Sequence, residues 1–221
     1  MTASKQTSRR SSLAFERILD AAVEQIAAEG MQGVRLAQIA KAAGVSVSLI
    51  HYHFETREVL LEEALMHAYT RADREREMWE RAQSTLTRAQ RLANMVDLML
   101  PGTDEHHVQE WRLWFELWMQ ALRTPSLQRA AGSLYERWQQ WWIDAIEGGI
   151  EAREFRRCNI RSVAARVLAL IDGFGVRAQI DPAASTEWAR DELLDYLAGV
   201  LGPKSGLAEL RDPYRLADAP S

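Results

Sequence analysis

The chain has 221 residues, of which 47% are hydrophobic and 26% charged, and its formal net charge is −4. This composition is typical of a folded globular protein and excludes a disordered chain, and apolar stretches such as 163–171 are too short and interrupted to cross a bilayer. The single cysteine, Cys158, excludes an intramolecular disulfide, and the N-terminus lacks the apolar run of a secretory signal. We therefore expect a cytoplasmic protein without a membrane partner.

Charge is unevenly distributed along the chain. Residues 1–57 contain seven lysines and arginines against five acidic residues, a net charge of +2, whereas the remaining residues carry −6. A basic excess confined to one segment has the sign expected for contact with nucleic acid. The overall negative charge therefore does not exclude a DNA-binding protein.

Helical periodicity begins near the N-terminus. Apolar residues recur at spacings of three and four over 13–28, which predicts a first helix that ends at Gly30. Ahead of this helix, residues 1–12 include Arg9 and Arg10, and we expect them to form a flexible basic arm.

Two short helices with a glycine between them follow, at 36–43 and 46–53. Gly44 occupies the point where the chain reverses, and glycine adopts positive φ without a Cβ penalty. Ser46 is placed to cap the second helix. This is the layout of a helix-turn-helix, whose second helix enters the DNA major groove. The spacing alone is also compatible with a plain helical hairpin.

The polar rim of this motif is a candidate DNA-reading surface. Ser48 can bond to any base edge, and the methyl groups of Val47 and Leu49 suit the methyl of thymine. The three residues 51–53, His51, Tyr52 and His53, can bond phosphate oxygens, as can the downstream Arg57. Such bonds set the register of the protein on the duplex. The predicted DNA-binding residues are Arg9, Arg10, Arg35, Gln38, Ser46, Val47, Ser48, Leu49, His51, Tyr52, His53 and Arg57.

Helical stripes continue through the rest of the chain, without strand-like alternation. A long helix at about 56–82 is densely charged in its later half, which is typical of a solvated connector. Further helices are predicted at about 85–100, 105–123, 126–152, 160–179 and 185–200. We expect residues 203–221 to be loosely ordered. The fold class predicted is all-α, with an N-terminal three-helix head and a larger α-helical body.

Residues 12–61 resemble the DNA-binding head of the TetR family of one-component transcriptional regulators. The matched residues are Ile18-Leu19-Asp20-Ala21-Ala22, Gly30, Gln38-Ile39-Ala40, Ala43-Gly44-Val45-Ser46, Tyr52-His53-Phe54, Arg57 and Leu60-Leu61. The resemblance implies a DNA-binding domain at 1–57 and a ligand-binding and dimerisation domain at 58–202, in which 58–82 is the connector helix. It also implies a homodimer that binds double-stranded DNA at a palindromic operator.

Three residues depart from the family pattern. Ser48 stands where the family most often has glycine, His51 replaces the commoner tyrosine, and Arg35 stands where a threonine usually caps the second helix. The loss of that cap brings a cation close to the backbone. These departures bear on which operator sequence is bound, rather than on the mode of binding.

The body resembles a subgroup of the same family. Residues 111–125, 168–173 and 176–178 are similar to BetI-like repressors, which respond to choline-type small molecules. The similarity lies mostly in helix-packing residues, so it indicates the subgroup better than the ligand.

Aromatic residues gather in the predicted helices at 105–123 and 126–152. Tryptophan faces with nearby carboxylates bind desolvated organic cations, with each contact contributing on the order of 0.5–2 kcal/mol. Aromatic stripes also form protein cores and dimer surfaces, and that alternative stays open here. The predicted ligand-binding residues, for a small amphipathic or cationic effector, are Trp111, Trp114, Phe115, Trp118, Trp138, Trp142 and Asp172.

Apolar stripes on the last two predicted helices are assigned to a dimer interface, with interior packing as the alternative. The residues assigned are Val163, Val167, Leu170, Phe174, Leu194 and Leu197. Two-fold symmetry would present one recognition helix to each operator half-site.

The sequence thus predicts a repressor that leaves its operator when an effector shifts the connector helix. The alternatives are a redox-sensing regulator that uses Cys158, or a small helical enzyme. The adjacent His106 and His107 point about 100° apart on a helix, unlike the i,i+4 pair of zinc sites. We predict no catalytic residue, no metal and no cofactor.

Overall fold

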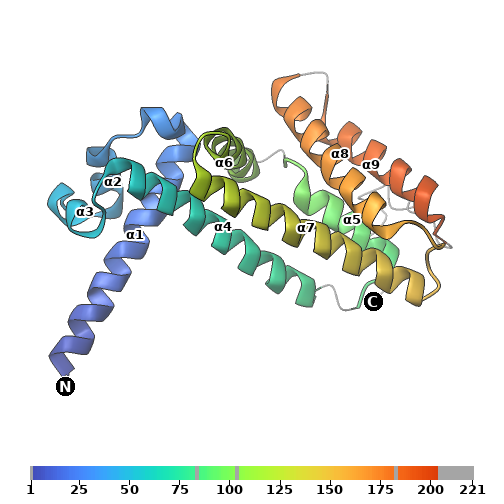
Figure 1. The fold of residues 1–221 in the computed structure, drawn as a ribbon, viewed down its shortest axis with the longest axis horizontal. Helices are drawn as coiled ribbons and strands as arrows, with labels where there is room; N and C mark the ends of the chain where they lie inside the picture. Colours follow the sequence, from blue (N-terminus) through green and yellow to red (C-terminus); the bar gives the residue numbers. More distant parts are fainter. Residues whose placement is uncertain (1, 83–84, 103–104, 182–183, 204–221) are drawn as a thin grey trace. The chain divides into compact units, whose positions relative to one another are not determined.

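The computed structural model describes residues 2–82, 85–102, 105–181 and 184–203, and in these ranges all side chains except those of 2–12, 75, 105 and 106. The described chain is all-α, as predicted, and contains no strand (Figure 1). Its helices are α1 (Thr2–Gly33), α2 (Leu36–Ala43), α3 (Val47–His53), α4 (Arg57–Ala82), α5 (Arg88–Met99), α6 (Glu105–Ala121), α7 (Pro125–Glu151), α8 (Ile160–Ile180) and α9 (Thr186–Leu201). Among these helices, none has the length and hydropathy that a bilayer span requires. The tail at 204–221 lies outside the described residues.

The helices lie within three residues of their predicted positions, with one exception at the N-terminus. α1 begins at Thr2, so the predicted flexible arm is wrong and residues 2–12 belong to the helix. The physical reason is that the stretch 2–29 contains neither proline nor glycine to interrupt the helix. At Gly30 the backbone takes φ 68° and ψ 161°, a conformation open essentially to glycine alone, and the helix kinks there.

The chain packs as two compact units. Among the described residues, the first unit lies within 1–80 and 109–131, and the second lies within 81–108 and 132–221. Most of α4, much of α6 and the start of α7 therefore pack with the helix-turn-helix. The functional boundary expected near residue 57 stays a prediction.

The core of the first unit is built on one face of α1. Ile18, Ala22 and Ile26 are fully buried there, and Ile39 of α2 and Ile50 of α3 are buried in the same unit. Burial of each of these isoleucine side chains stabilises the fold by about 1.5–3 kcal/mol. The two short helices are thus held by α1, as their apolar pattern predicts.

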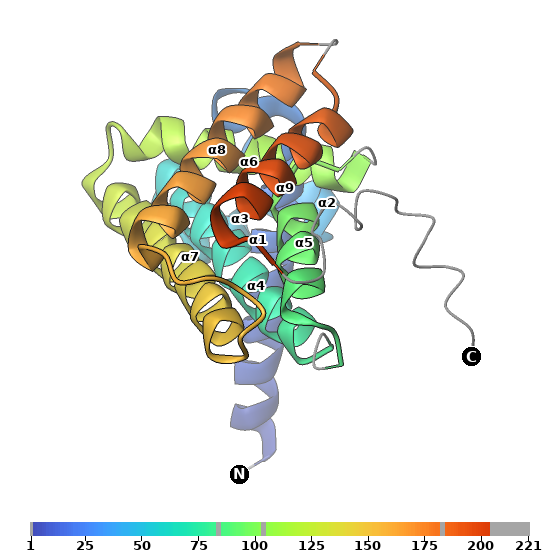
Figure 2. The same cartoon turned by 90° about the vertical axis from the view of Figure 1, so that its right-hand side faces the viewer.

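The second unit contains the pair α8 and α9, which lie side by side in both views (Figures 1 and 2). Leu193, Leu197 and Leu201 of α9 are fully buried. α9 is also tied to the segment around α5, because Arg190 Nε donates to Asp97 Oδ1 at 2.5 Å. These contacts set which faces of α8 and α9 remain exposed.

Candidate DNA-binding surface and effector site

The turn into α3 has the geometry that its sequence predicts. Gly44 lies in the left-handed region at φ 63° and ends α2, where its N–H donates to the carbonyl of Lys41 at 3.3 Å. The hydroxyl of Ser46 accepts from the N–H of Leu49 at 3.2 Å, so Ser46 is the N-cap of α3. The helix-turn-helix is therefore formed by local contacts that require these residue types.

α3 exposes most of its predicted reading residues. Tyr52 is 78% exposed and Val47 38% exposed, and Ser48 and His51 are also exposed. Leu49 is half-buried. These side chains of α3 are accessible to a DNA major groove, and their contacts with bases stay a prediction.

Arg35 and Gln38 lie at the N-terminus of α2. Arg35 is exposed and has the extended backbone of an N-cap, but a guanidinium has no acceptor and cannot cap the helix. Instead, Gln38 Oε1 accepts from the Arg35 N–H at 2.9 Å, and Gln38 Nε2 donates to Glu29 Oε1 at 2.9 Å. Gln38 thus holds the end of α2, while the Arg35 side chain stays available to a phosphate.

His53 is more enclosed than its predicted phosphate contact requires. Its ring meets Phe15 edge-on with 5.7 Å between centroids and also contacts Tyr52 at 5.1 Å. Its Nε2 is buried and has no hydrogen-bond partner within the described residues. Aromatic packing is the role that the structure assigns to His53, and a DNA contact through Nε2 would need the ring to move.

Arg57 makes contacts that the sequence analysis missed. Its Nε donates to the carbonyl of Val34 at 3.0 Å, and its Nη2 donates to the carbonyls of Met31 and Gln32, the latter at 3.3 Å. These acceptors belong to the end of α1 and the turn into α2, where helix carbonyls have no partner of their own. Arg57 therefore fastens the first residue of α4 to the head. No pattern in the sequence signals a bond that spans 23–26 residues.

The side chains of Arg9 and Arg10 lie outside the described residues. The backbone there belongs to α1, and their contact with DNA stays a prediction.

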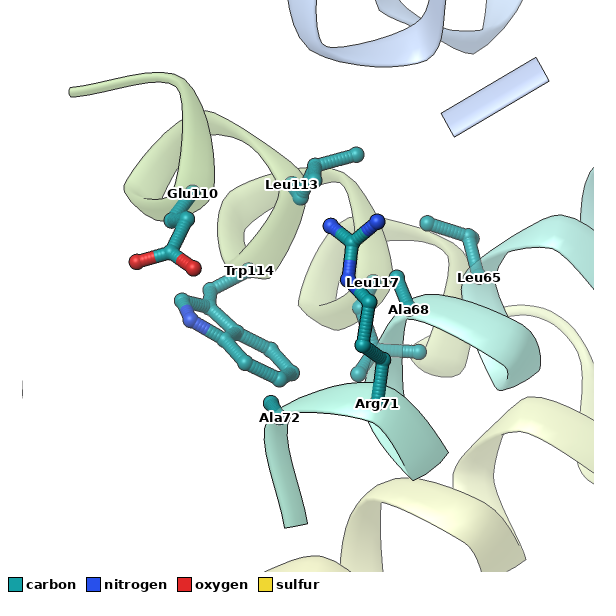
Figure 3. A pocket seen from close by; sticks show the side chains of 8 residues that line it. All are labelled: Leu65, Ala68, Arg71, Ala72, Glu110, Leu113, Trp114 and Leu117. Atoms are coloured by element: carbon teal, nitrogen blue, oxygen red, sulfur yellow. The ribbon is translucent and has the colours of Figure 1, made fainter. Parts of the chain in front are cut away.

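A hollow between α4 and α6 is the candidate effector site (Figure 3), and we call it the α4–α6 hollow. It is lined by Leu65, Ala68, Arg71, Ala72, Glu110, Leu113, Trp114 and Leu117, all within the first unit. Figure 3 shows Glu110 and Trp114 side by side on α6, with Arg71 reaching in from α4. The cavity measures about 20 Å³, which holds about one water molecule, so an organic ligand enters only if α4 and α6 separate.

The other aromatic candidates are placed differently. Trp111, Phe115 and Trp118 contact one another on α6, and Trp111 is only 6% exposed. Trp142 is fully buried, and its Nε1 donates to the Met99 sulfur at 3.2 Å. Trp111 and Trp142 therefore belong to the hydrophobic core, which was the alternative interpretation of the aromatic stripe. Of the aromatic candidates, Trp114 alone lines the α4–α6 hollow.

Asp172 and Tyr135 form a half-buried pair that bridges α8 and α7. Tyr135 Oη donates to Asp172 Oδ2 at 2.7 Å, and the Tyr135 ring meets Trp138 edge-on. Burial raises the pKa of Asp172, and the hydrogen bond from Tyr135 opposes part of that rise. The pKa of Tyr135 is raised by burial and by the same bond to Asp172.

The substitution Asp172→Asn is expected to stabilise the protein near neutral pH but not in acid. A carboxyl whose pKa is raised in the fold favours the folded state fully only below its unfolded pKa of about 3.9, and this stability is lost as the pH rises through the folded pKa. Asparagine still accepts from Tyr135 but never ionises. The melting temperature should rise by on the order of 2 °C at pH 7, and the gain should vanish near pH 3.5. A gain of equal size at both pH values would contradict the raised pKa.

The residues assigned to a dimer interface are mostly interior. Val163 is 4% exposed, Val167, Leu194 and Leu197 are fully buried within one chain, and Leu170 is half-buried. The half-buried Phe174 packs edge-on against Trp188 of α9 at 5.0 Å. These four residues are buried in the interior of the second unit, to which both α8 and α9 belong. The exposed face of α8 carries Ala165, Ala169, Gly173, Val176 and Ile180 instead.

Cys158 is half-buried in the loop before α8. Burial raises the pKa of its thiol, and the nearby Arg156 lowers it by a smaller amount. A raised pKa keeps the thiol protonated at neutral pH, where the thiolate is the reactive form. The side chain of His106 lies outside the described residues, and no group of three metal-ligating side chains occurs in the described chain.

Comparison with known families assigns both parts of the chain. Residues 18–64 match the model of bacterial regulatory proteins of the tetR family, and residues 88–202 match that of the BetI-type transcriptional repressor, C-terminal. The regulator BetI of Burkholderia mallei is 24% identical over 194 residues, covering 85% of this chain and 93% of that protein.

Two solved structures are also similar. A transcriptional regulator from Saccharomonospora viridis in complex with choline is 29% identical, with a TM-score of 0.74, covering 86% of this chain and 98% of that one. A TetR-family regulator from Rhodococcus sp. is 29% identical, with a TM-score of 0.70, and the match covers 86% of this chain and 99% of that one.

Proposed function

Because the chain belongs to the TetR family of bacterial transcriptional regulators and carries a BetI-type repressor C-terminal domain, we propose that it acts in the cytoplasm as a homodimer on a palindromic operator. It leaves the operator when a small cationic or amphipathic effector binds. The observation that carries the proposal is the exposed rim of α3, set by the Gly44 turn and the Ser46 cap.

The dimer forms through the exposed face of α8. Ala165, Ala169 and Gly173 recur at four-residue spacing on this face, and small side chains allow two helices to approach closely. Ile180, 75% exposed, continues the same face. Burial of this face against its symmetric copy would give a self-complementary contact, which is the arrangement that a two-fold axis requires.

The chemistry of the hollow and the ligand of a relative both indicate the class of effector. The Saccharomonospora viridis regulator was solved with choline, a small organic cation. In this chain Glu110 and Trp114 offer a carboxylate beside an indole, a combination that stabilises such cations. Arg71 lines the same hollow and would oppose a bare cation, so we expect an effector that also carries a polar or anionic group at its other end.

Two contacts couple the hollow to the DNA-binding helices. Arg57 of α4 bonds to carbonyls at the end of α1 and in the turn into α2, and Glu116 of α6 lies beside Gly30 at the kink of α1. A Cβ built on Gly30 would lie 2.8 Å from Glu116 Oε1. Since α4 and α6 also line the hollow, a ligand that separates them shifts the turn from which α2 and α3 follow. Such a shift changes operator affinity by as much as the ligand's affinities for the two states differ.

An operator titration with and without effector tests this function. Genomic fragments bound by the purified protein are selected, and the affinity for one of them is measured across a panel of choline and larger quaternary amines. We expect saturating effector to weaken operator binding by about 5–150-fold. Unchanged operator affinity, with bound effector reported by tryptophan fluorescence, would contradict the release mechanism.

Variants of the hollow separate effector binding from DNA binding. Trp114→Leu and Glu110→Gln are each expected to weaken effector binding about tenfold, while operator affinity without effector stays unchanged. Glu136→Gln, which removes an exposed carboxylate outside the hollow, is the matched control. If a neutral ligand quenched tryptophan fluorescence and no cation of the panel changed it, the prediction of a cationic effector would be wrong.

A further inference from the structure

The loop between α7 and α8 borders a second hollow, unrelated to the helix-turn-helix, which we call the arginine hollow. It has a volume of about 660 Å³ and is open to solvent. Its lining residues are Ile150, Glu151, Arg153, Phe155, Arg157, Cys158 and Ile160, all in the second unit.

Two arginines of the hollow have no partner in the described chain. Arg153 and Arg157 are exposed, and their guanidinium groups make no hydrogen bond or ion pair with the described residues. The neighbouring Arg156 differs, because its Nε donates to the carbonyl of Val200 at 2.5 Å and holds the end of α9. With Glu151 as the single carboxylate in the lining, the hollow has a net positive charge.

Arg153 occupies a backbone position that favours glycine. Its φ is 60°, and among the described residues it is the only non-glycine with positive φ. The N–H of Arg153 donates to the Ile150 carbonyl at 3.0 Å and that of Glu154 to the Gly149 carbonyl at 2.9 Å, which is the Schellman ending of a helix. Glycine is the usual residue at this point because it has no Cβ penalty. The arginine here adds a cationic side chain at the expense of backbone strain.

The floor of the hollow is apolar and closely packed. Phe155 is 5% exposed and lies so near the backbone of α7 that a Cβ built on Gly149 would be 2.0 Å from its Cδ2. Ile150 and Ile160 are half-buried beside it. A ligand in the hollow therefore meets a fixed apolar surface with cationic groups at its border.

We propose that the arginine hollow binds a small amphipathic organic anion. Its carboxylate, sulfonate or phosphate bonds to the guanidinium groups of Arg153 and Arg157, whose planar forks match such oxygens. Its apolar part rests on Phe155 and the two isoleucines. This ligand needs no cationic group, whereas the proposed effector does, so the two sites select different molecules. The inference stands whether or not the proposed effector is correct.

Titration of the full-length protein with 8-anilinonaphthalene-1-sulfonate, an amphipathic anion that fluoresces when bound, tests the site. Arg157→Gln is expected to weaken binding about tenfold, since a hydrogen bond to a charged group is lost. The control Arg161→Gln removes an exposed arginine that does not line the hollow and should leave affinity unchanged. The neutral analogue N-phenyl-1-naphthylamine should bind wild type and Arg157→Gln equally.

Arg153→Gly separates ligand binding from folding, because it should raise the melting temperature while lowering affinity for the anion. Dodecanoate and dodecyl phosphate, added as competitors, distinguish a carboxylate from a phosphate ligand. No binding by the probe, equal loss in Arg161→Gln, or unchanged affinity in Arg153→Gly and Arg157→Gln would overturn the proposal. Displacement by polyglutamate but by neither dodecyl compound would also overturn it, in favour of a docking surface for an acidic protein.

Discussion

Replacing Arg57 by alanine is expected to lower the free energy of unfolding of the first unit by about 2–4 kcal/mol. A single hydrogen bond to a charged group contributes about 1.5–3 kcal/mol, and the contributions of neighbouring bonds do not simply add. The variant leaves the carbonyls of Met31, Gln32 and Val34 without the guanidinium that now bonds to them. Urea unfolding followed by circular dichroism measures the change.

Two further variants test whether the loss of stability comes from the Arg57 hydrogen bonds. Arg57→Lys keeps the charge but lacks the planar fork, and should recover only part of the loss. Arg17→Ala removes an exposed arginine of α1 and should change stability by less than about 0.5 kcal/mol. If Arg57 served DNA phosphates alone, Arg57→Ala would keep full stability and reduce the salt slope of operator binding by about one.

Ala169→Glu is expected to convert the proposed dimer into a folded monomer. Ala169 is exposed on α8, so the substitution should leave the protomer stable, but at a two-fold contact the new carboxylate faces its own symmetric copy. Operator affinity should fall by at least about 100-fold, because two linked heads bind far more tightly than one. Size-exclusion chromatography with light scattering reports the mass, and operator titration reports the affinity.

Leu197→Ala provides the contrast to this variant. Leu197 of α9 is fully buried within one chain, and its truncation should cost about 2–5 kcal/mol of stability without a direct effect on association. Ala82→Glu, at an exposed position near the end of α4, is the matched control for the new charge. A dimeric Ala169→Glu together with a stable monomeric Leu197→Ala would favour the interface assigned from the apolar stripes.

The sequence by itself determined the features that depend on neighbouring residues. Helix positions follow from apolar periodicity, and the helix-turn-helix follows from Gly44 at a positive φ and Ser46 as a cap three residues before Leu49. Such effects act within one turn of the chain, so residue type and spacing are enough to predict them. The resemblance of residues 12–61 to the TetR family rests on the same local pattern, and the family comparison confirms it.

Only the tertiary structure decided which partner covers each helix face and which faces remain exposed. A periodic stripe indicates that a face is buried but not by which partner. Val163 and Leu197 were assigned to a dimer interface, although both are buried within a single chain. The positive charge of Arg57 predicts that its guanidinium bonds to oxygen acceptors. It does not predict which ones, because the carbonyls that accept these bonds are more than 20 residues away in the sequence. These outcomes depend on contacts between residues distant in sequence, which local propensity does not encode.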